Sequence, residues 1–322
     1  MSTFIRAVEA WVPDKTGSLL EYGGGSYGSA RGFGAINRGM CFGRGEGLPG
    51  RAWEKGRPII LKQLADSYFL RARAARAAGL SCAIAVPWFA GAALSAVLVI
   101  FCGDDESHVG AIEHWHNDAA QSLDLALEDG VYGGTAELFE FLSRHTCFRK
   151  GNGLPGLAWE SGLPVFMADL GKSTQFLRKE GALKAGITRG FALPCPSAPR
   201  PAADPEAEQD TDVVAFLSAL ATPIVRRFET WLPDAKGRHL VRSEGFCEAR
   251  GVLPALPPSD RIERGAGAIG QALASRTPQI AEQASAEQGV VGDEARVGGL
   301  HSLVALPVLK DGVVTAVVAW YF

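Results

Sequence analysis

Two histidines in the sequence could take part in metal chemistry. His114 and His116 are two residues apart in a segment expected to be a strand, so both side chains leave from the same face. One interpretation is a surface metal site, since imidazole and carboxylate groups bind metals and several such residues lie nearby in the sequence: Asp104, Asp105, Glu106 and His108. The other is a pair of partly buried histidines, because the matching positions elsewhere in the chain are mostly apolar. We favour the second interpretation and expect no metal.

Two glycine-rich blocks could hold a phosphate. They read Gly-Glu-Gly-Leu-Pro-Gly at 45–50 and Gly-Asn-Gly-Leu-Pro-Gly at 151–156, and glycines let backbone N–H groups approach an anion at a helix N-terminus. Neither block has the Lys-Ser/Thr ending of a P-loop, and neither follows an expected parallel strand. We therefore interpret both as turns into a helix with proline in its first turn.

Six cysteines are the remaining reactive side chains: Cys41, Cys82, Cys102, Cys147, Cys195 and Cys247. They form no Cys-x-x-Cys pair in a chain of 322 residues, which argues against both a disulfide framework and a zinc site. We expect free thiols in a reducing compartment.

The elements that position these residues repeat along the chain. Trp11, Trp115 and Trp231 each close a strand-like block in which glutamate stands two residues earlier, and each is followed by aspartate three residues later. The glycine block follows in each repeat, in a weaker form at 265–270, and the proline that opens the next strand is 13 residues after its first glycine every time. Such agreement indicates three tandem repeats, which we place at 1–104, 105–220 and 221–322.

One repeat reads as a small α+β domain. In the first we expect strands at 5–12 and 18–22, a helix at 48–55, a strand at 59–61, a helix at 67–78 and a closing hairpin at 83–86 and 96–101. An antiparallel sheet of about five strands with helices on one side fits this order. The second repeat has an insertion near 196–212, rich in Pro, Ala and acidic residues, which we expect to be disordered.

The sequence resembles the GAF family. The resemblance is carried by GEGLPGRAWEKGRPIIL and GLSCAIAVPWFAGAALSAVLVIF in the first repeat and by GNGLPGLAWESGLPVFMADL in the second. The third repeat, GAGAIGQALASRTPQIAE, is degenerate because it lacks both Leu-Pro-Gly and the helix tryptophan. The resemblance implies three tandem GAF-like (PAS/GAF-type) domains but leaves the ligand or cofactor unknown.

Two cysteine functions of this family can be compared with the sequence. GAF-type photoreceptors attach a bilin through a cysteine that is usually followed by histidine, whereas phenylalanine follows both Cys41 and Cys147. GAF-type methionine sulfoxide reductases use several cysteines clustered in one domain. Cys41, Cys82 and Cys102 do share one repeat, but their spacing is wide, so this enzyme is a minor alternative.

The resemblance favours a non-catalytic sensor of bacterial signal transduction that binds a small molecule. We expect no catalytic residues and no metal, and a pocket between sheet and helices in the first two repeats. The predicted pocket residues are Phe42, Trp53, Phe69, Cys82, Phe148, Trp159, Phe176 and Phe191. Because no kinase, cyclase or DNA-binding module is evident, we expect a separate effector protein such as a kinase or regulator. The alternative is a structural or assembly protein that uses degenerate GAF units for protein interaction.

The composition sets limits on partners. A net charge of −3, with 47% apolar residues, gives no basic surface for nucleic acid or an anionic membrane. The N-terminal residues do not read as a signal peptide, and the apolar stretch at 83–102 is broken by proline and glycine. We therefore expect a cytoplasmic protein.

Short junctions predict one rigid body. Only residues 103–108 and 219–224 separate one repeat from the next, too few for a connecting helix. On the opening strands we assign the apolar set, such as Val8 and Ala10, to the core of each repeat. That leaves Trp11, Trp115 and Trp231 on an interaction face. We expect this face to be covered either by exchange of opening strands in a pseudo-threefold ring or by a homodimer.

Overall fold

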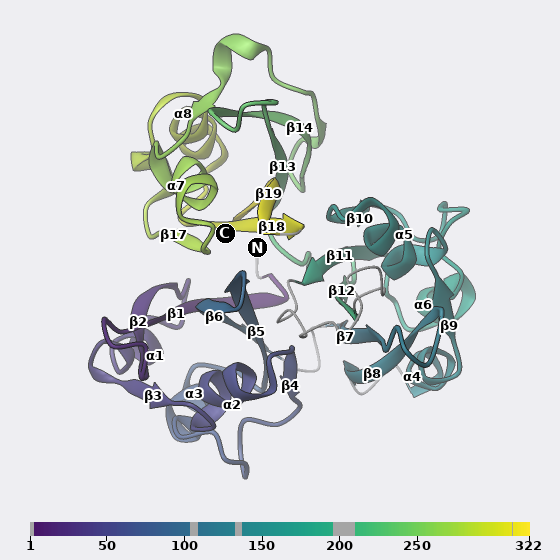
Figure 1. The fold of residues 1–322 in the computed structure, drawn as a ribbon. Coiled ribbons are helices and arrows are strands. Elements are labelled where there is room, and N and C mark those ends of the chain that lie inside the picture. Colours follow the sequence, from purple (N-terminus) through teal and green to yellow (C-terminus); the bar gives the residue numbers. More distant parts are fainter. Residues whose placement is uncertain (1–2, 104–108, 133–136, 196–209, 311) are drawn as a thin grey trace.

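Three antiparallel sheets with helices packed on them form the computed structural model (Figure 1). The structure describes residues 3–103, 109–132, 137–195, 210–310 and 312–322. The sheets have six, six and seven strands in chain order, so the predicted α+β class with three tandem units is confirmed.

The first unit has the predicted elements in the predicted order, with others among them. Its elements are β1 (Ile5–Pro13), β2 (Leu19–Ser26), α1 (Arg31–Gly34), η1 (Asn37–Gly39), β3 (Cys41–Gly43), α2 (Gly47–Lys55), β4 (Ile59–Leu61), α3 (Ala72–Ala77), β5 (Cys82–Ala90) and β6 (Ala93–Cys102). Of these, α1, η1 and β3 were not predicted, and β3 makes the sheet six-stranded where about five strands were expected. Helix α3 is shorter than the predicted 67–78. The Ser67 hydroxyl donates to the Leu64 carbonyl and accepts from the Phe69 N–H, and these local bonds hold the preceding residues in a turn.

The second unit repeats this plan. Its elements are β7 (Gly110–Asn117), β8 (Asp124–Tyr132), α4 (Glu137–Arg144), β9 (Cys147–Arg149), α5 (Gly153–Ser161), β10 (Val165–Met167), α6 (Lys179–Lys184), β11 (Arg189–Cys195) and β12 (Thr211–Ser218). Of the predicted disordered insertion at 196–212, residues 196–209 lie outside the described residues. Thr211 and Asp212 belong to β12, because they pair with β7.

The third unit is complete although its sequence is degenerate. Its elements are β13 (Arg227–Pro233), β14 (His239–Cys247), β15 (Gly251–Leu253), η2 (Pro258–Asp260), β16 (Ile262–Glu263), α7 (Gly267–Ser275), β17 (Gln279–Ala281), η3 (Ala284–Ala286), α8 (Gly289–Gly298), β18 (Leu303–Lys310) and β19 (Val313–Tyr321).

Each glycine block enters its helix as predicted. A Cβ on Gly50 would lie 2.0 Å from the Gly43 carbonyl oxygen, and the matching Gly156 and Gly270 are equally crowded by backbone. Glycine is therefore needed there so that the helix can approach the preceding segment closely. The blocks shape a turn, as expected from the sequence.

The strand order rules out exchange between the units. The sheets run β3-β2-β1-β6-β5-β4, β10-β11-β12-β7-β8-β9 and β15-β14-β13-β19-β18-β17. Each opening strand therefore lies beside the closing strand of its own unit. The predicted exchange of opening strands is wrong, because the closing hairpin of each unit already provides the partner edge.

The assignment of the two sheet faces was inverted. Trp11, Trp115 and Trp231 are fully buried, and each packs in the helix-facing core of its own unit. They form no interaction face. Alternation along a strand separates two faces but does not say which one the helices cover, and here the helices cover the face that carries glutamate and tryptophan.

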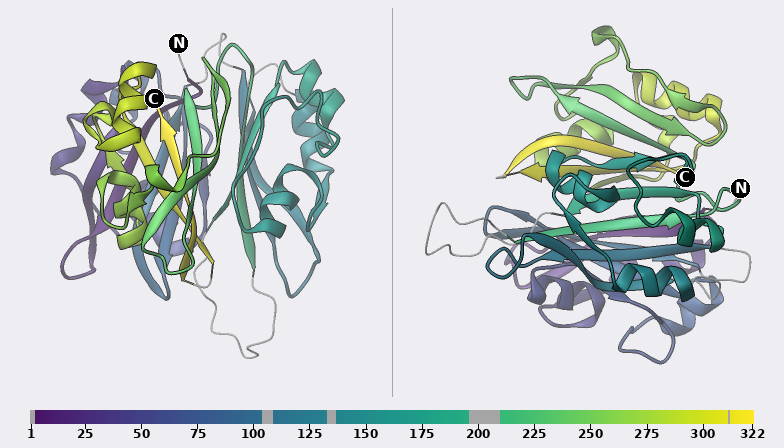
Figure 2. Two further views of the ribbon diagram at one scale, coloured as in Figure 1. Left: turned by 90° about the horizontal axis from the view of Figure 1, so that it is seen from above. Right: turned by 90° about the vertical axis from the view of Figure 1, so that its right-hand side faces the viewer.

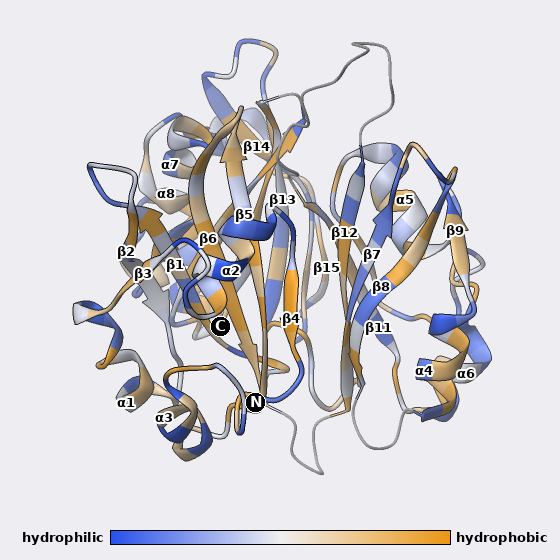
Figure 3. Cartoon of the chain, turned by 60° about the horizontal axis from the view of Figure 1, so that its bottom comes forward, coloured by the Kyte–Doolittle hydropathy of each residue, from blue (hydrophilic) through white to orange (hydrophobic). Residues whose placement is uncertain are grey.

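The opposite faces of all three sheets meet in one central core. The Trp320 ring from the third unit lies 5.5 Å from Phe191 and 5.8 Å from Phe216 of the second, centroid to centroid. The Trp88 indole of the first unit donates to the Pro307 carbonyl of the third at 2.9 Å. Figure 2 shows the strands inside and the helices outside. Coloured by hydropathy, the helices α1, α3, α4 and α6 again lie at the periphery (Figure 3).

The units close into a ring with three seams. Strand β4 of the first unit lies against β8 of the second, and β17 of the third lies against β2 of the first. Between the second and third units, the Phe166 ring packs at a tilt against Phe246 of β14, with the ring centroids 5.1 Å apart. The pseudo-threefold ring is therefore present, but it arises from sheets packed face to face. No described helix is long and apolar enough to span a membrane.

The shared core predicts that the three units unfold together. Trp320→Ala removes a side chain that two units share, and we expect it to lower the free energy of unfolding by about 3–5 kcal/mol. Differential scanning calorimetry of the variant and of the parent should each show one cooperative transition.

The control is Val252→Ala, because Val252 is 79% exposed and a surface truncation changes stability by less than about 0.5 kcal/mol. Separate transitions for the three units in the parent protein would contradict a shared core.

Candidate functional site

The predicted pocket of the first unit holds a buried ion pair. Glu9 is completely buried on β1, and Arg71, just before α3, is 5% exposed. The guanidinium group donates to both carboxylate oxygens, Nη1 to Oε1 at 2.7 Å and Nη2 to Oε2 at 3.0 Å. The Trp11 indole N–H donates to Oε2 at 3.0 Å. The carboxylate can be buried because the guanidinium group compensates its charge and the indole N–H adds a hydrogen bond.

Aromatic rings surround the arginine of this pair. The Arg71 guanidinium carbon lies 4.6 Å from the ring centre of Phe33, 5.0 Å from Phe69 and 5.7 Å from Trp11. Cation–π contacts of this kind are strong where water is excluded. The arginine thus occupies the space between sheet and helices in which a ligand was expected.

The second unit has the same centre at matching positions. Arg178 donates to both oxygens of the buried Glu113, and Trp115 and Tyr132 donate to it at 3.0 and 2.9 Å. Arg71 and Arg178 were missed in the sequence analysis. Both end a Phe-Leu-Arg triplet eight residues before a matching glycine, and this repeat could have identified them.

The third unit rebuilds the centre from other positions. Valine stands at the matching position of Arg71, and Arg227 and Arg242 on β13 and β14 bind Glu229 instead. Glu294 of α8 pairs with both arginines, and the Tyr321 hydroxyl donates to Glu229 at 2.7 Å. Different residues satisfy the same buried glutamate, so the glutamate beside the tryptophan is the common feature.

The eight predicted pocket residues divide between the two faces of their sheets. Six lie on the helix-facing side: Phe42, Trp53, Phe69, Phe148, Trp159 and Phe176. Cys82 and Phe191 lie on the opposite face, in the central core. Their strands, β5 and β11, alternate, and these two positions point away from the helices.

The histidine pair binds a carboxylate. His114 Nε2 and His116 Nδ1 lie 2.7 and 3.1 Å from the same oxygen of Asp212, and Arg57 of the first unit reaches that oxygen at 3.3 Å. Asp104, Asp105, Glu106 and His108 lie outside the described residues. Within the described part of the chain, no three His, Cys, Asp or Glu side chains are grouped so that they could hold a metal.

The cysteines considered for catalysis are not brought together. Cys82 and Cys102 are cross-strand neighbours on β5 and β6, but Cys41 is exposed on β3, and strands β2 and β1 lie between β3 and β6. Burial raises the pKa of the Cys102 thiol well above its ordinary value, which disfavours the nucleophilic thiolate. Cys147, at the position matching Cys41, is also exposed.

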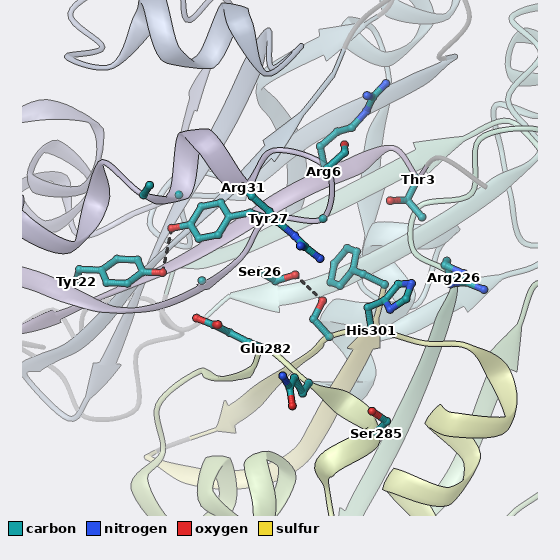
Figure 4. A pocket seen from close by; sticks show the side chains of 18 of the residues that line it. Thr3, Arg6, Tyr22, Ser26, Tyr27, Arg31, Arg226, Glu282, Ser285 and His301 are labelled. Carbon is teal, nitrogen blue, oxygen red and sulfur yellow. Dashed lines mark hydrogen bonds between the residues drawn. The ribbon is translucent and has the colours of Figure 1, made fainter.

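An open cleft of about 1320 Å³ lies at the seam between the third and first units (Figure 4). It is larger than the 300–1,000 Å³ or so that is typical of a small-molecule site. Its floor joins the two units, since the hydroxyl oxygens of Ser26 on β2 and Ser302 before β18 are 2.6 Å apart. The walls carry Thr3, Arg6, Tyr22, Tyr27, Arg31, Arg38, Arg226, Glu282, Ser285 and His301. We call this the seam cleft.

A small residue on β2, Ser26, lines the seam cleft where the other two units carry larger side chains. In each sheet the buried glutamate pairs with a glycine of the second strand, so the strands align position by position. The residue after that glycine is Ser26 in the first unit, Val131 in the second and Phe246 in the third. The residue before it is Gly24, where the other units have Asp129 and Glu244. Side chains that fill the other two seams are therefore missing here.

Tyr27 links the seam cleft to the buried centre of the first unit. Its ring lines the cleft and lies over Gly25, where a Cβ would come within 2.5 Å of the hydroxyl. This hydroxyl lies 3.4 Å from Glu9 Oε1 and accepts from the Asn37 amide at 2.7 Å. Burial, and then the charge of Glu9, raises the pKa of Tyr27, so the phenol stays protonated. A molecule that contacts Tyr27 in the cleft is therefore linked through its hydroxyl to Asn37 and Glu9.

Comparisons with known proteins identify structures similar to parts of this chain. No family model matches the sequence, and no curated protein is similar to it. The nlh2 GAF domain of A. aeolicus in an inactive state is 21% identical, with 32% of this chain and 60% of that chain covered and a TM-score of 0.26.

Two further structures have similar values. The NreA protein of Staphylococcus aureus, mutated in its nitrate binding site, is 19% identical over 37% of this chain and 80% of its own, with a TM-score of 0.26. A GAF domain/HD domain protein from Geobacter sulfurreducens is 14% identical over 34% and 62%, with a TM-score of 0.23. GAF-domain structures are among the matches. The likeness is too low to indicate ligand or activity.

The buried pairs predict that loss of the arginine strongly destabilises the fold and that removal of the glutamate charge as well restores much of the stability. Arg178→Met leaves Glu113 buried without a counter-charge, so we expect the free energy of unfolding to fall by about 3–5 kcal/mol. The double variant Glu113→Gln with Arg178→Met removes both charges and should recover a large part of this loss. Urea denaturation of the parent, the single variant and the double variant measures the three free energies of unfolding.

The matched control is Arg149→Met, whose side chain is 75% exposed and pairs with Asp124 at the surface. If Arg178→Met were no more destabilising than this control, the buried pair would have no structural role.

Acid should weaken the same centre. Burial by itself raises the pKa of Glu113, but the charge of Arg178 and the hydrogen bonds to the carboxylate outweigh it, so the pKa lies below its ordinary 4.5. A depressed pKa stabilises the fold above the ordinary value, and this contribution is lost as the pH falls through the folded-state pKa. Glu113→Gln should therefore reduce the fall in unfolding free energy between about pH 7 and about pH 3.

Urea titrations at both pH values test this, with Glu21→Gln as the exposed control. An unchanged pH dependence in Glu113→Gln would mean that Glu113 contributes nothing to acid sensitivity.

Proposed function

We propose that this protein is a non-catalytic cytoplasmic sensor that binds a small molecule in the seam cleft and acts on a separate effector protein, such as a kinase or regulator. One observation carries the proposal. The seam between the third and first units is open, whereas side chains close the other two seams and arginines fill the helix-facing cores of the first two units. We therefore place the ligand site in the cleft between two units, and not in the pocket between sheet and helices that the sequence predicted.

The groups that line the seam cleft suit binding. Guanidinium, phenol and hydroxyl groups offer hydrogen bonds from both units. The hydroxyls of Ser26 and Ser302 bond each other, and within the described residues neither has the histidine or carboxylate partner that activates a nucleophile. This supports a binding role over catalysis.

The position of the seam cleft offers a way to report occupancy. A ligand there contacts two units at once, so its binding energy depends on how they are placed relative to one another. Through the Tyr27 hydroxyl it also reaches the Glu9–Arg71 pair, which holds the start of α3 against the sheet. A change on the outer surface of the first unit is the signal that we propose an effector reads.

A second candidate function is that of an assembly protein. Large apolar side chains are exposed on and beside the helices α4 and α6 of the second unit, at about half or more of their surface: Leu138, Phe141, Leu177 and Leu183. Apolar patches of this kind often mark protein contacts. This face would serve a partner protein or a homodimer.

The sensor proposal predicts binding that a blocked cleft abolishes. Ala35 is exposed at the cleft wall in a helical conformation, so Ala35→Trp should fold and place an indole ring in the cleft, where it obstructs a ligand. Against a panel of neutral, anionic and cationic metabolites, we expect at least one compound to raise the stability of the parent. At a hundredfold excess over Kd the gain is about 2.7 kcal/mol. Ala35→Trp should lose this gain, as measured by thermal denaturation.

The control is Ala77→Trp, an exposed alanine on α3 outside the cleft. Compounds that bind the parent and Ala35→Trp equally would rule out the seam cleft as the site. A dimer in native mass spectrometry, together with no binding from any class, would favour the assembly function instead.

A further inference from the structure

We infer that the molecule bound in the seam cleft is an organic anion with a carboxylate or phosphate group. The inference rests on the proposed function and adds the chemical class of the ligand. It follows from the charges that line the cleft and from a comparison of this seam with the other two.

Cationic groups dominate the lining. Among the described lining residues, one carboxylate side chain, that of Glu282, stands against guanidinium groups from both units, which are always protonated: Arg6, Arg31, Arg38 and Arg226. Within the described residues, Arg31, Arg38 and Arg226 form no ion pair with a carboxylate. Arg226 donates instead to the carbonyl oxygens of Gly299 and Gly298, at 2.7 and 3.3 Å, which bind its N–H groups without cancelling its charge.

The seam between the first and second units shows how such charges are neutralised elsewhere. There Lys62, just after β4, lies 2.7 Å from Asp129 of β8, and Lys55 lies 3.6 Å from Glu128. The strand β2 has Gly23 and Gly24 where β8 has these two acids. The strand β2 therefore has no acids at the positions where β8 pairs with the lysines of the first unit, and Arg31, Arg38 and Arg226 have no such carboxylate partner within the described residues.

The arrangement of these groups fits a molecule with one anionic end. Figure 4 shows Arg31 directed toward the serine pair on the floor, with His301 and Arg226 on the same side. Glu282 and Tyr22 lie on the other side. The volume of about 1320 Å³ exceeds what an inorganic ion fills, and phenol groups offer stacking and hydrogen bonds to an organic part. Arginine recognises carboxylate and phosphate alike.

Isothermal titration with citrate and with inorganic phosphate tests this, with glucose and spermidine as neutral and cationic probes. We expect citrate, and more weakly phosphate, to bind the parent protein and to bind less well as the salt concentration rises. Arg31→Gln and Arg38→Gln should each weaken citrate binding by about tenfold, because a charge-assisted contact is lost. Glu282→Gln should strengthen it by about threefold, since it removes the opposing charge.

The matched control is Arg76→Gln, an exposed arginine of α3 outside the cleft, which should leave citrate binding unchanged. Near-ultraviolet circular dichroism confirms that each variant is folded. Citrate without phosphate would assign the site to carboxylates, and stronger binding of phosphate would assign it to phosphate compounds.

Two results would overturn the inference. One is no binding of either anion, or binding that Arg31→Gln and Glu282→Gln leave unchanged. The other is binding of glucose or spermidine alone, blocked by Ala35→Trp. In that case the seam cleft would remain the ligand site, so the proposed function would stand while the anionic class failed.

Discussion

Burial of both faces of every sheet is the constraint on which the rest of this structure depends. A sheet that has helices on one side normally leaves its other side to solvent or to a partner. Here the second side of each sheet packs against the other two, around Trp88, Phe216 and Trp320. Three sheets sharing one core must meet along seams, so each unit presents its second strand to an edge strand of the preceding one. The ring, the seams and the cleft all follow from this packing.

The helix-facing cores solve a different problem, that of a charged residue in an apolar layer. Each unit buries a glutamate two residues before its tryptophan, and removing that charge from water is costly unless it is paired. The first two units pair it with the arginine of a Phe-Leu-Arg triplet. The third pairs it with arginines from its own strands, and the tyrosine that donates to it, Tyr321, lies on β19. The third unit thus resembles the other two less in sequence and pairs its buried glutamate with different residues, but it keeps the same fold.

The three seams between the units differ in the side chains that line them. One seam is closed by ion pairs such as Lys62–Asp129, and another by the aromatic contact of Phe166 with Phe246. At the third, the small residue Ser26 of β2 lines a space that stays open. Repeats that share one fold need not share a site, because a ring of similar units has as many seams as units and each seam can evolve on its own. The seam cleft is a property of the ring, since its two walls come from the ends of the chain.

The sequence by itself determined the repeats, the class of fold and most of the elements. Equal spacing from the glycine block to the next proline identifies matching positions, and period-two patterns mark strands whatever they pack against. The sequence did not decide which face of each sheet the helices cover. The pattern placed Glu9 and Trp11 on an outward face, because a charged residue is normally exposed. The sequence does not show that Arg71, 62 residues away, neutralises the charge of Glu9. Nor could it reveal the seam cleft, which joins Ser26 to Ser302. Such contacts between distant segments depend on how three sheets pack, and only the tertiary structure decides that.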